Sequence, residues 1–232
     1  KSWESLYLSS NVQKQRVQES SVSETNLSRV NSALLYTGNG LASLLSTFSP
    51  TTLGRGTNQN AFITTNQWKL TFTNFSNVKM CYEFYYVTPK NDRAGTFQEE
   101  VTSLTAIIDN PGGFNNVFTN WRPEDVPEIL KQWKILSKCV MRLSGGETGE
   151  IHCRDHLYRK ITQSDVTTAR NFLAGLTTQL YVRWYGAPTG LFDTLASPNP
   201  AIIDTTFGDF KCSTGFLMES GRNYFLADTD FT

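Results

Sequence analysis

Apolar and polar side chains alternate along several stretches of this chain, and such alternation predicts β-strands. The clearest stretch is 78–88, which a proline follows. One face of this strand would carry Met80, Tyr82, Phe84 and Tyr86. Residues 66–76 alternate in the same way and direct Trp68, Leu70 and Phe72 inward. Only Asn77 separates the two stretches, so we expect them to form an antiparallel pair.

Residues 131–160 predict two more strands around a glycine-rich turn. The turn spans 144–149 and holds three glycines, which supply the positive φ that a reversal needs. On the first strand one apolar face would hold Trp133, Ile135, Cys139, Met141 and Leu143. On the second strand Ile151, Cys153 and Leu157 share a face that Asp155 interrupts. The opposite face would hold His152, Arg154, His156, Tyr158 and Lys160. We predict that the two strands form a β-hairpin.

The remaining elements are shorter or less regular. Residues 96–109 predict a helix, because Thr96 and Glu99 form a capping box and apolar residues follow at helical spacing. Another helical turn is expected at 123–130. Further strands are predicted at 12–22, at 177–185 and within 202–227, whereas 26–65 and 188–200 have the composition of long polar loops.

These elements amount to about eight strands with one or two short helices and long loops. That pattern is typical of an all-β protein, either a jelly roll or another β-sandwich. A chain of 232 residues can fold as one domain of this class, and we treat 1–232 as a single domain.

Two motifs make the chain resemble a known family. Residues 133–143 have the form W-K-I-L-S-K followed later by leucine, then come a glycine-rich acidic turn and a basic strand. Residues 180–188 read L-Y-V-R-W-Y-G-A-P. Together they resemble capsid proteins of small circular Rep-encoding single-stranded DNA (CRESS-DNA, circovirus-like) viruses. The resemblance implies a single jelly-roll shell domain of antiparallel strands, and it extends over about residues 131–190.

Charge alone does not favour nucleic acid as a partner. The chain has 21 Lys and Arg residues and 21 Asp and Glu residues, so its formal net charge is zero. A free-standing nucleic-acid-binding domain is normally basic. The resemblance implies an arginine-rich N-terminal arm, and we predict that this arm precedes residue 1.

Basic residues on the polar faces of the predicted strands could nevertheless contact DNA phosphates without reading sequence. Taken singly, each is more often a solvated surface charge. The candidates are Lys14, Arg16, Lys69, Lys79, Arg154, Arg159, Lys160 and Arg183. Trp68, Trp184 and Tyr185 could stack on bases, although aromatic residues in strands usually belong to the core.

No pattern in the sequence predicts catalysis, a metal ion or a cofactor. His152 and His156 share a strand face but would lie about 13 Å apart, too far for direct ligation of one ion. No serine lies in a G-x-S-x-G turn, and no glycine-rich segment completes a phosphate loop. The four cysteines (Cys81, Cys139, Cys153 and Cys212) are scattered and read as free thiols.

The resemblance therefore predicts a non-enzymatic capsid protein whose partners are copies of itself and a single-stranded DNA genome. It would act in the virion, after assembly in the host nucleus or cytoplasm, and would bind a host receptor that the sequence does not identify. No segment is apolar enough to predict membrane insertion. The alternative is a secreted carbohydrate-binding β-sandwich, in which Trp121 near Asn120 or Trp184 near Tyr185 would meet the sugar.

Overall fold

The computed structural model describes residues 13–25, 31–38, 59–75, 79–109, 122–162, 171–186 and 212–228. Eight strands form two antiparallel four-stranded sheets. Sheet A has the order β1 (Gln13–Thr25), β8 (Cys212–Asp228), β3 (Gln59–Asn74), β6 (Thr148–Thr162). Sheet B has the order β2 (Asn31–Gly38), β7 (Thr178–Gly186), β4 (Met80–Pro89), β5 (Trp133–Leu143).

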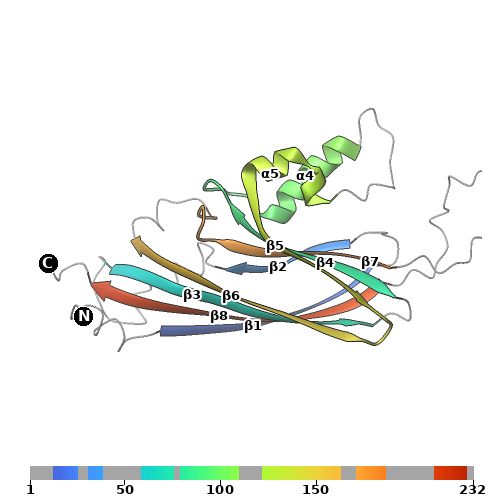
Figure 1. Ribbon diagram of the computed structural model, residues 1–232, viewed down its shortest axis with the longest axis horizontal. Helices are drawn as coiled ribbons and strands as arrows, with labels where there is room; N and C mark the ends of the chain where they lie inside the picture. Colours follow the sequence, from blue (N-terminus) through green and yellow to red (C-terminus); the bar gives the residue numbers. More distant parts are fainter. Residues whose placement is uncertain are drawn as a thin grey trace, which may run out of the picture.

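The order of the strands makes the sandwich a jelly roll. Successive strands lie in different sheets throughout, except that β4 and β5 are neighbours in sheet B. Eight antiparallel strands that pass back and forth between two packed sheets in this way form a jelly roll. The predicted fold class is therefore confirmed (Figure 1).

Both predicted strand pairings were wrong. β5 and β6 flank the glycine turn, but β5 pairs with β4 and β6 pairs with β3. Likewise β3 and β4 follow one another closely and lie in opposite sheets. A tight turn reverses the chain direction, yet it does not determine whether the next strand pairs beside the last one or crosses to the other sheet. The apolar faces of both sheets have to be buried together, and here that requirement selects the crossing.

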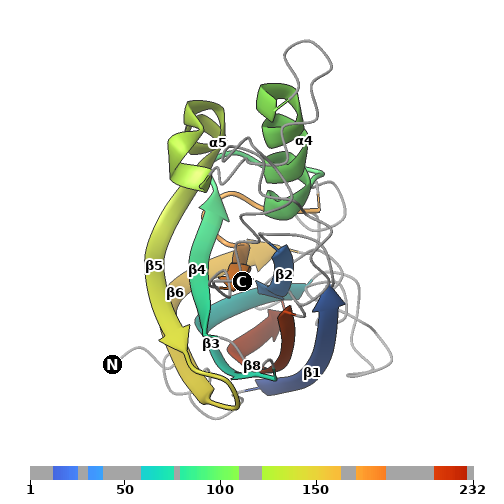
Figure 2. The same cartoon turned by 90° about the vertical axis from the view of Figure 1, so that its right-hand side faces the viewer.

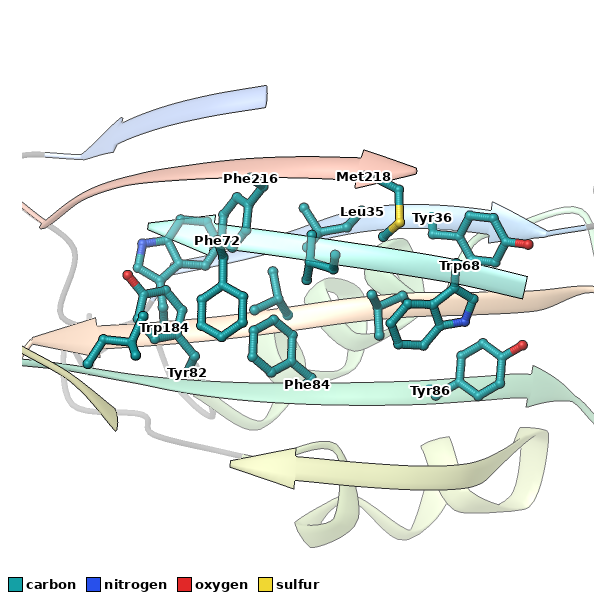
Figure 3. Packing of buried hydrophobic residues seen from close by; sticks show 14 of the residues in the cluster. Leu35, Tyr36, Trp68, Phe72, Tyr82, Phe84, Tyr86, Trp184, Phe216 and Met218 are labelled. Atoms are coloured by element: carbon teal, nitrogen blue, oxygen red, sulfur yellow. The ribbon is translucent and has the colours of Figure 1, made fainter. Parts of the chain in front are cut away.

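The main core lies between the sheets and is rich in aromatic residues (Figure 3). The predicted inward faces of β3 and β4 are confirmed, because both sets of side chains belong to this core. Phe72 packs against Phe84 with ring centroids 4.7 Å apart, and Trp68 packs against Tyr86 at 5.4 Å. Trp184 of β7 contacts Phe216 of β8 edge-on.

A helical layer covers the outer face of sheet B (Figures 1 and 2). It consists of α4 (Phe97–Asp109), the 3₁₀ turn η1 (Pro123–Asp125) and α5 (Pro127–Gln132). The predicted capping box is present, since the Glu99 amide donates to Thr96 Oγ1 and the Thr96 amide donates to Glu99 Oε2. Phe97 packs edge-on against Trp133 and Tyr181. As a result, β4 is buried on both faces.

A β-bulge in β5 changes which face its apolar residues occupy. Tyr86 pairs with Ser137 and Val87 pairs with Ile135, so Leu136 is the extra residue. Trp133 and Ile135 consequently pack under the helices, whereas Met141 and Leu143 pack between the sheets. The single apolar face predicted for this strand is therefore divided between two clusters.

Two further differences concern element boundaries. β2 lies within 26–65, which was expected to be a loop. β8 continues as one strand through Gly215 and Gly221, where the sequence left its division open. The predicted loop at 188–200 lies outside the described residues. None of the described helices is long and apolar enough to cross a membrane.

Candidate nucleic-acid interface

The outer face of sheet A is the surface on which most of the predicted basic residues meet. No described element packs on this face, whereas α4 and α5 cover the outer face of sheet B (Figures 1 and 2). Alternating residues of β6 project from it and are exposed: His152, Arg154, His156, Tyr158 and Lys160. This confirms the polar face predicted for β6.

Strand register connects the two edges of this face. Arg16 of β1 pairs with Gly221 of β8, Gly221 pairs with Gln67 of β3, and Gln67 pairs with Arg154 of β6. Directly paired residues in antiparallel strands share a face. Arg16 and Arg154 therefore belong to one row across the sheet, with a glycine and a glutamine between them. Three inter-strand spacings of about 4.8 Å separate their backbones, a total of about 14 Å.

The two neighbouring rows also carry basic residues, and in the third row Glu219 pairs with Lys69. Lys14 pairs with Asn223, in the row that reaches His156 through Thr65. Lys69 lies in the third row, beside His152. Register thus places Lys14, Arg16, Lys69 and Arg154 on one face. For the two residues of β1 this is a backbone position, because their side chains lie outside the description.

The cations on this face differ in how strongly they are neutralised. Lys69 Nζ lies 2.9 Å from Glu150 Oε2, and the hydrogen bond from Lys69 to Glu150 raises the lysine pKa above its ordinary value. No described carboxylate forms an ion pair with Arg154 or Lys160. Lys160 Nζ lies 5.9 Å from the ring centroid of Phe62 on the same face. Arg154 and Lys160 therefore carry the charges most available to a phosphate.

Three of the predicted basic residues lie elsewhere. Lys79 immediately precedes β4, so it belongs to the margin of sheet B. Arg159 pairs with the inward-facing Ile63 and donates to the Ala174 carbonyl at 2.7 Å. Arg183 lies on the outer face of sheet B and is only 3% exposed.

Arg183 belongs to a buried ionic network around Glu83, which is 1% exposed. Arg183 Nη1 lies 3.2 Å from Glu83 Oε2, and Arg122 Nη2 lies 3.2 Å from Glu83 Oε1. The hydroxyls of Tyr85 and Tyr185 donate to the same carboxylate at 2.9 and 3.3 Å. Glu83 raises the pKa of the Arg122 guanidinium. The network uses the charge of Arg183 inside the subunit and removes this residue from the candidate interface.

The aromatic residues proposed for base stacking are also placed elsewhere. Trp68 and Trp184 are buried between the sheets, and the Tyr185 hydroxyl is bound to Glu83. Sheet A presents His156 and Tyr158 instead, with near-parallel rings whose centroids are 6.0 Å apart. The sequence alternation had already placed both on the polar face of β6, but it gave no reason to assign them a role.

The described residues contain no group of three or more His, Cys, Asp or Glu side chains suited to a metal ion. Cys139 and Cys153 line one cavity of about 340 Å³ between β5 and β6, together with Trp68 and Tyr86. Burial and the nearby Asp155 raise the pKa of Cys153 to about 11. A thiol that is protonated at neutral pH is a poor nucleophile. Cys81, Cys139 and Cys153 are free thiols. The side chain of Cys212 lies outside the described part of the chain.

Several solved structures are similar to this chain at a low level. Desmodium yellow mottle tymovirus has 11% identity over 95% of this chain and 91% of its own, with a TM-score of 0.33. The empty head of turnip yellow mosaic virus has 9% identity over 95% and 86%, with the same TM-score. A semi-empty virus-like particle of the freshwater prawn nodavirus, Macrobrachium rosenbergii nodavirus, has 8% identity over 93% and 86%, again with a TM-score of 0.33.

No family model and no curated protein matches the chain. At a TM-score of 0.33 the structural likenesses carry no argument about fold or function. The fold therefore rests on strand order and register, and the candidate site rests on the side chains of sheet A.

Proposed function

We propose that this chain is a structural capsid protein that self-assembles into an icosahedral shell and packages circular single-stranded DNA. The observation that carries the proposal is the strand order β1-β8-β3-β6 over β2-β7-β4-β5, which makes the chain a jelly roll. Jelly rolls include viral capsid domains, and the sequence resembles capsid proteins of circovirus-like CRESS-DNA viruses. Because one fold serves many functions, the proposal also needs support from a site.

The exposed face of sheet A supplies that support. In this proposal, it lines the inside of the shell, where Arg154, Lys160 and Lys69 contact phosphates, together with Lys14 and Arg16 from β1. Contacts to phosphate alone carry no sequence information, which suits a protein that must cover a whole genome. The chain has zero net charge, so the arginine-rich arm expected before residue 1 would supply most of the salt-dependent affinity.

Assembly is the first property to measure. Light scattering and negative-stain images of the purified protein at neutral pH should show uniform particles of tens of subunits, in which nuclease-resistant single-stranded DNA can be detected. A stable monomer or dimer, from a chain that includes its natural N-terminus, would overturn the shell proposal. Uniform particles without nucleic acid would retain the shell and remove the packaging role.

One of the two sugar sites suggested for the carbohydrate-binding alternative is not accessible. Trp184 is buried between the sheets and contacts Phe216, so it cannot form an exposed platform for a sugar ring. Trp121 and Asn120 lie outside the described residues. A glycan screen is therefore the experiment to follow a monomeric result, with Trp121→Ala as its test variant.

A further inference from the structure

Tyr158 occupies an unusual position on the candidate interface. Its φ is +46°, in the left-handed region that bulky residues rarely adopt. The register explains how it arises, because Leu157 and Tyr158 of β6 lie opposite the single residue Thr64 of β3. An extra residue of this kind forms a β-bulge, which can redirect a side chain. The Tyr158 side chain is 75% exposed.

Backbone strain of this kind persists when the surrounding structure enforces it, and it often marks a functional position. Burial does not account for this conformation, because Tyr158 is mostly exposed. Its described ring contact is His156, whose ring is inclined by only 14°. The stacked pair extends an aromatic surface outward from an exposed strand face.

Cations flank the aromatic pair on the same strand. Arg154, His156, Tyr158 and Lys160 are all exposed along β6, so a cation lies on either side of the aromatic pair. Arg154 and Lys160 have no described carboxylate partner, so either can neutralise a phosphate. Proteins that hold single strands without sequence preference combine these two features, cations for the backbone and aromatic rings for the bases.

We propose that Tyr158, supported by His156, is a base-stacking site for single-stranded DNA, and that Arg154 and Lys160 hold the phosphates on either side. The inference rests on the proposed function and makes it more specific. It assigns the preference for a single strand to one residue, because the bases of a duplex are stacked on each other and cannot stack on Tyr158. Bases of any identity have a π-face, so the site would not read sequence.

The test compares three substitutions of Tyr158 in the full chain, each measured for binding to a labelled oligo-dT and to a duplex of equal length at fixed salt. Tyr158→Phe keeps the ring and should keep the affinity. Tyr158→Leu keeps an apolar side chain and should weaken binding to oligo-dT by about 5- to 150-fold, the range for loss of one stacked base. Neither substitution should alter binding to the duplex.

Tyr158→Gly separates binding from folding. Glycine adopts a positive φ without steric cost, so this variant should unfold at a urea concentration no lower than the wild type. It should nevertheless lose affinity for oligo-dT as Tyr158→Leu does. Loss of binding in a variant with unimpaired stability cannot be a consequence of misfolding.

Substitution of a flanking cation tests the site independently. Lys160→Gln should lower affinity for single strands and duplexes alike and reduce the slope of log K against log salt by about 1. Tyr158→Leu should leave this slope unchanged, because a stacking residue releases no counterion.

Unchanged oligo-dT affinity in both Tyr158→Gly and Tyr158→Leu would overturn the stacking site, and so would an equal loss for oligo-dT and duplex. Particle formation, measured separately, distinguishes this failure from failure of the proposed function. If particles form and their DNA binding does not depend on Tyr158, the shell proposal is retained and the stacking site is rejected. If binding depends on Tyr158 but the protein never forms particles, the stacking site is retained and the shell proposal is rejected.

Discussion

The two outer faces of the sandwich differ in what covers them. The helical layer covers sheet B, so Glu83 and Arg183 are buried there and satisfy each other. No described element covers the outer face of sheet A, and Arg154 and Lys160 are exposed there. An arginine therefore has a different role on each face. Arg183 is part of the subunit's internal structure, and Arg154 is a candidate ligand for phosphate.

Substitution of arginine by methionine on each face should give the largest difference. Arg183→Met leaves the buried Glu83 carboxylate with the more exposed Arg122 as its remaining ionic partner, and we expect a loss of up to about 3 to 5 kcal/mol in the free energy of unfolding. Arg154→Met on the exposed face should change it by less than about 0.5 kcal/mol. Urea denaturation measures both. Equal effects would show that burial does not distinguish the faces.

Glutamine offers a second matched pair. Gln179 is fully buried in β7, and its Oε1 accepts a hydrogen bond from the Phe97 amide in the first turn of α4 at 2.9 Å. Gln179→Leu leaves that amide unpaired and should cost about 1 to 3 kcal/mol in urea denaturation. Gln67→Leu on the exposed face is the control and should be nearly neutral. A neutral Gln179→Leu would mean that water replaces the lost acceptor.

The helical layer should also make stability depend on pH. Burial opposes ionisation of Glu124, but the hydrogen bonds from Lys138 and from its own backbone amide outweigh burial and lower its pKa below the ordinary 4.5. A lowered carboxyl pKa contributes stability above pH 4.5 that is lost as the pH falls through the folded-state pKa. Glu124→Gln should therefore be less stable than the wild type at about pH 6, by at most about 1 kcal/mol.

At a pH well below 4.5 that difference should shrink, because protonation of the wild-type carboxyl increases as the pH falls. Urea denaturation at both pH values measures the change. Glu150→Gln, in the exposed ion pair with Lys69, is the control and should show little effect at either pH. A difference between Glu124→Gln and wild type that persists unchanged at low pH would contradict an ionic role.

The smallest stability effect is expected on the exposed face itself. Lys69→Gln should leave the free energy of unfolding within about 0.5 kcal/mol of wild type, because its ion pair is exposed. Its effect on the salt dependence of DNA binding should be smaller than that of Arg154→Gln, since Glu150 already neutralises Lys69. A larger effect of Lys69 would show that DNA displaces Glu150.

Local patterns predicted the elements well. The inward faces of β3 and β4, the capping box of α4 and the two faces of β6 all followed from the spacing of side chains. These features depend on neighbours in sequence, where a period of two or of 3.6 decides which side chains share a face. The positions of Lys69, Arg154 and Lys160 on the outer face of sheet A also followed from alternation. Lys79, Arg159 and Arg183 were assigned to polar faces in the same way but lie elsewhere.

Features that depend on residues far apart in the sequence could not be predicted from local patterns. The alternation in β5 gave no sign of the bulge at Leu136, and nothing local showed that Glu83 would meet Arg183 from a strand 100 residues later. Arg183 and Gln179 lie in β7, and both faces of this strand are buried. Alternation of polar and apolar residues therefore cannot show which of its side chains are exposed.

The sequence by itself determined that this chain forms antiparallel strands with a helical insertion, and it determined which side chains of β3, β4 and β6 share a face. Tertiary structure alone decided which strands pair, that the glycine turn joins two sheets, and that Arg183 is buried while Arg154 is exposed. The physical reason is that φ preferences and side-chain periodicity act over a few residues. Partner choice depends on burying the apolar faces of two complete sheets against each other, with helices over one of them.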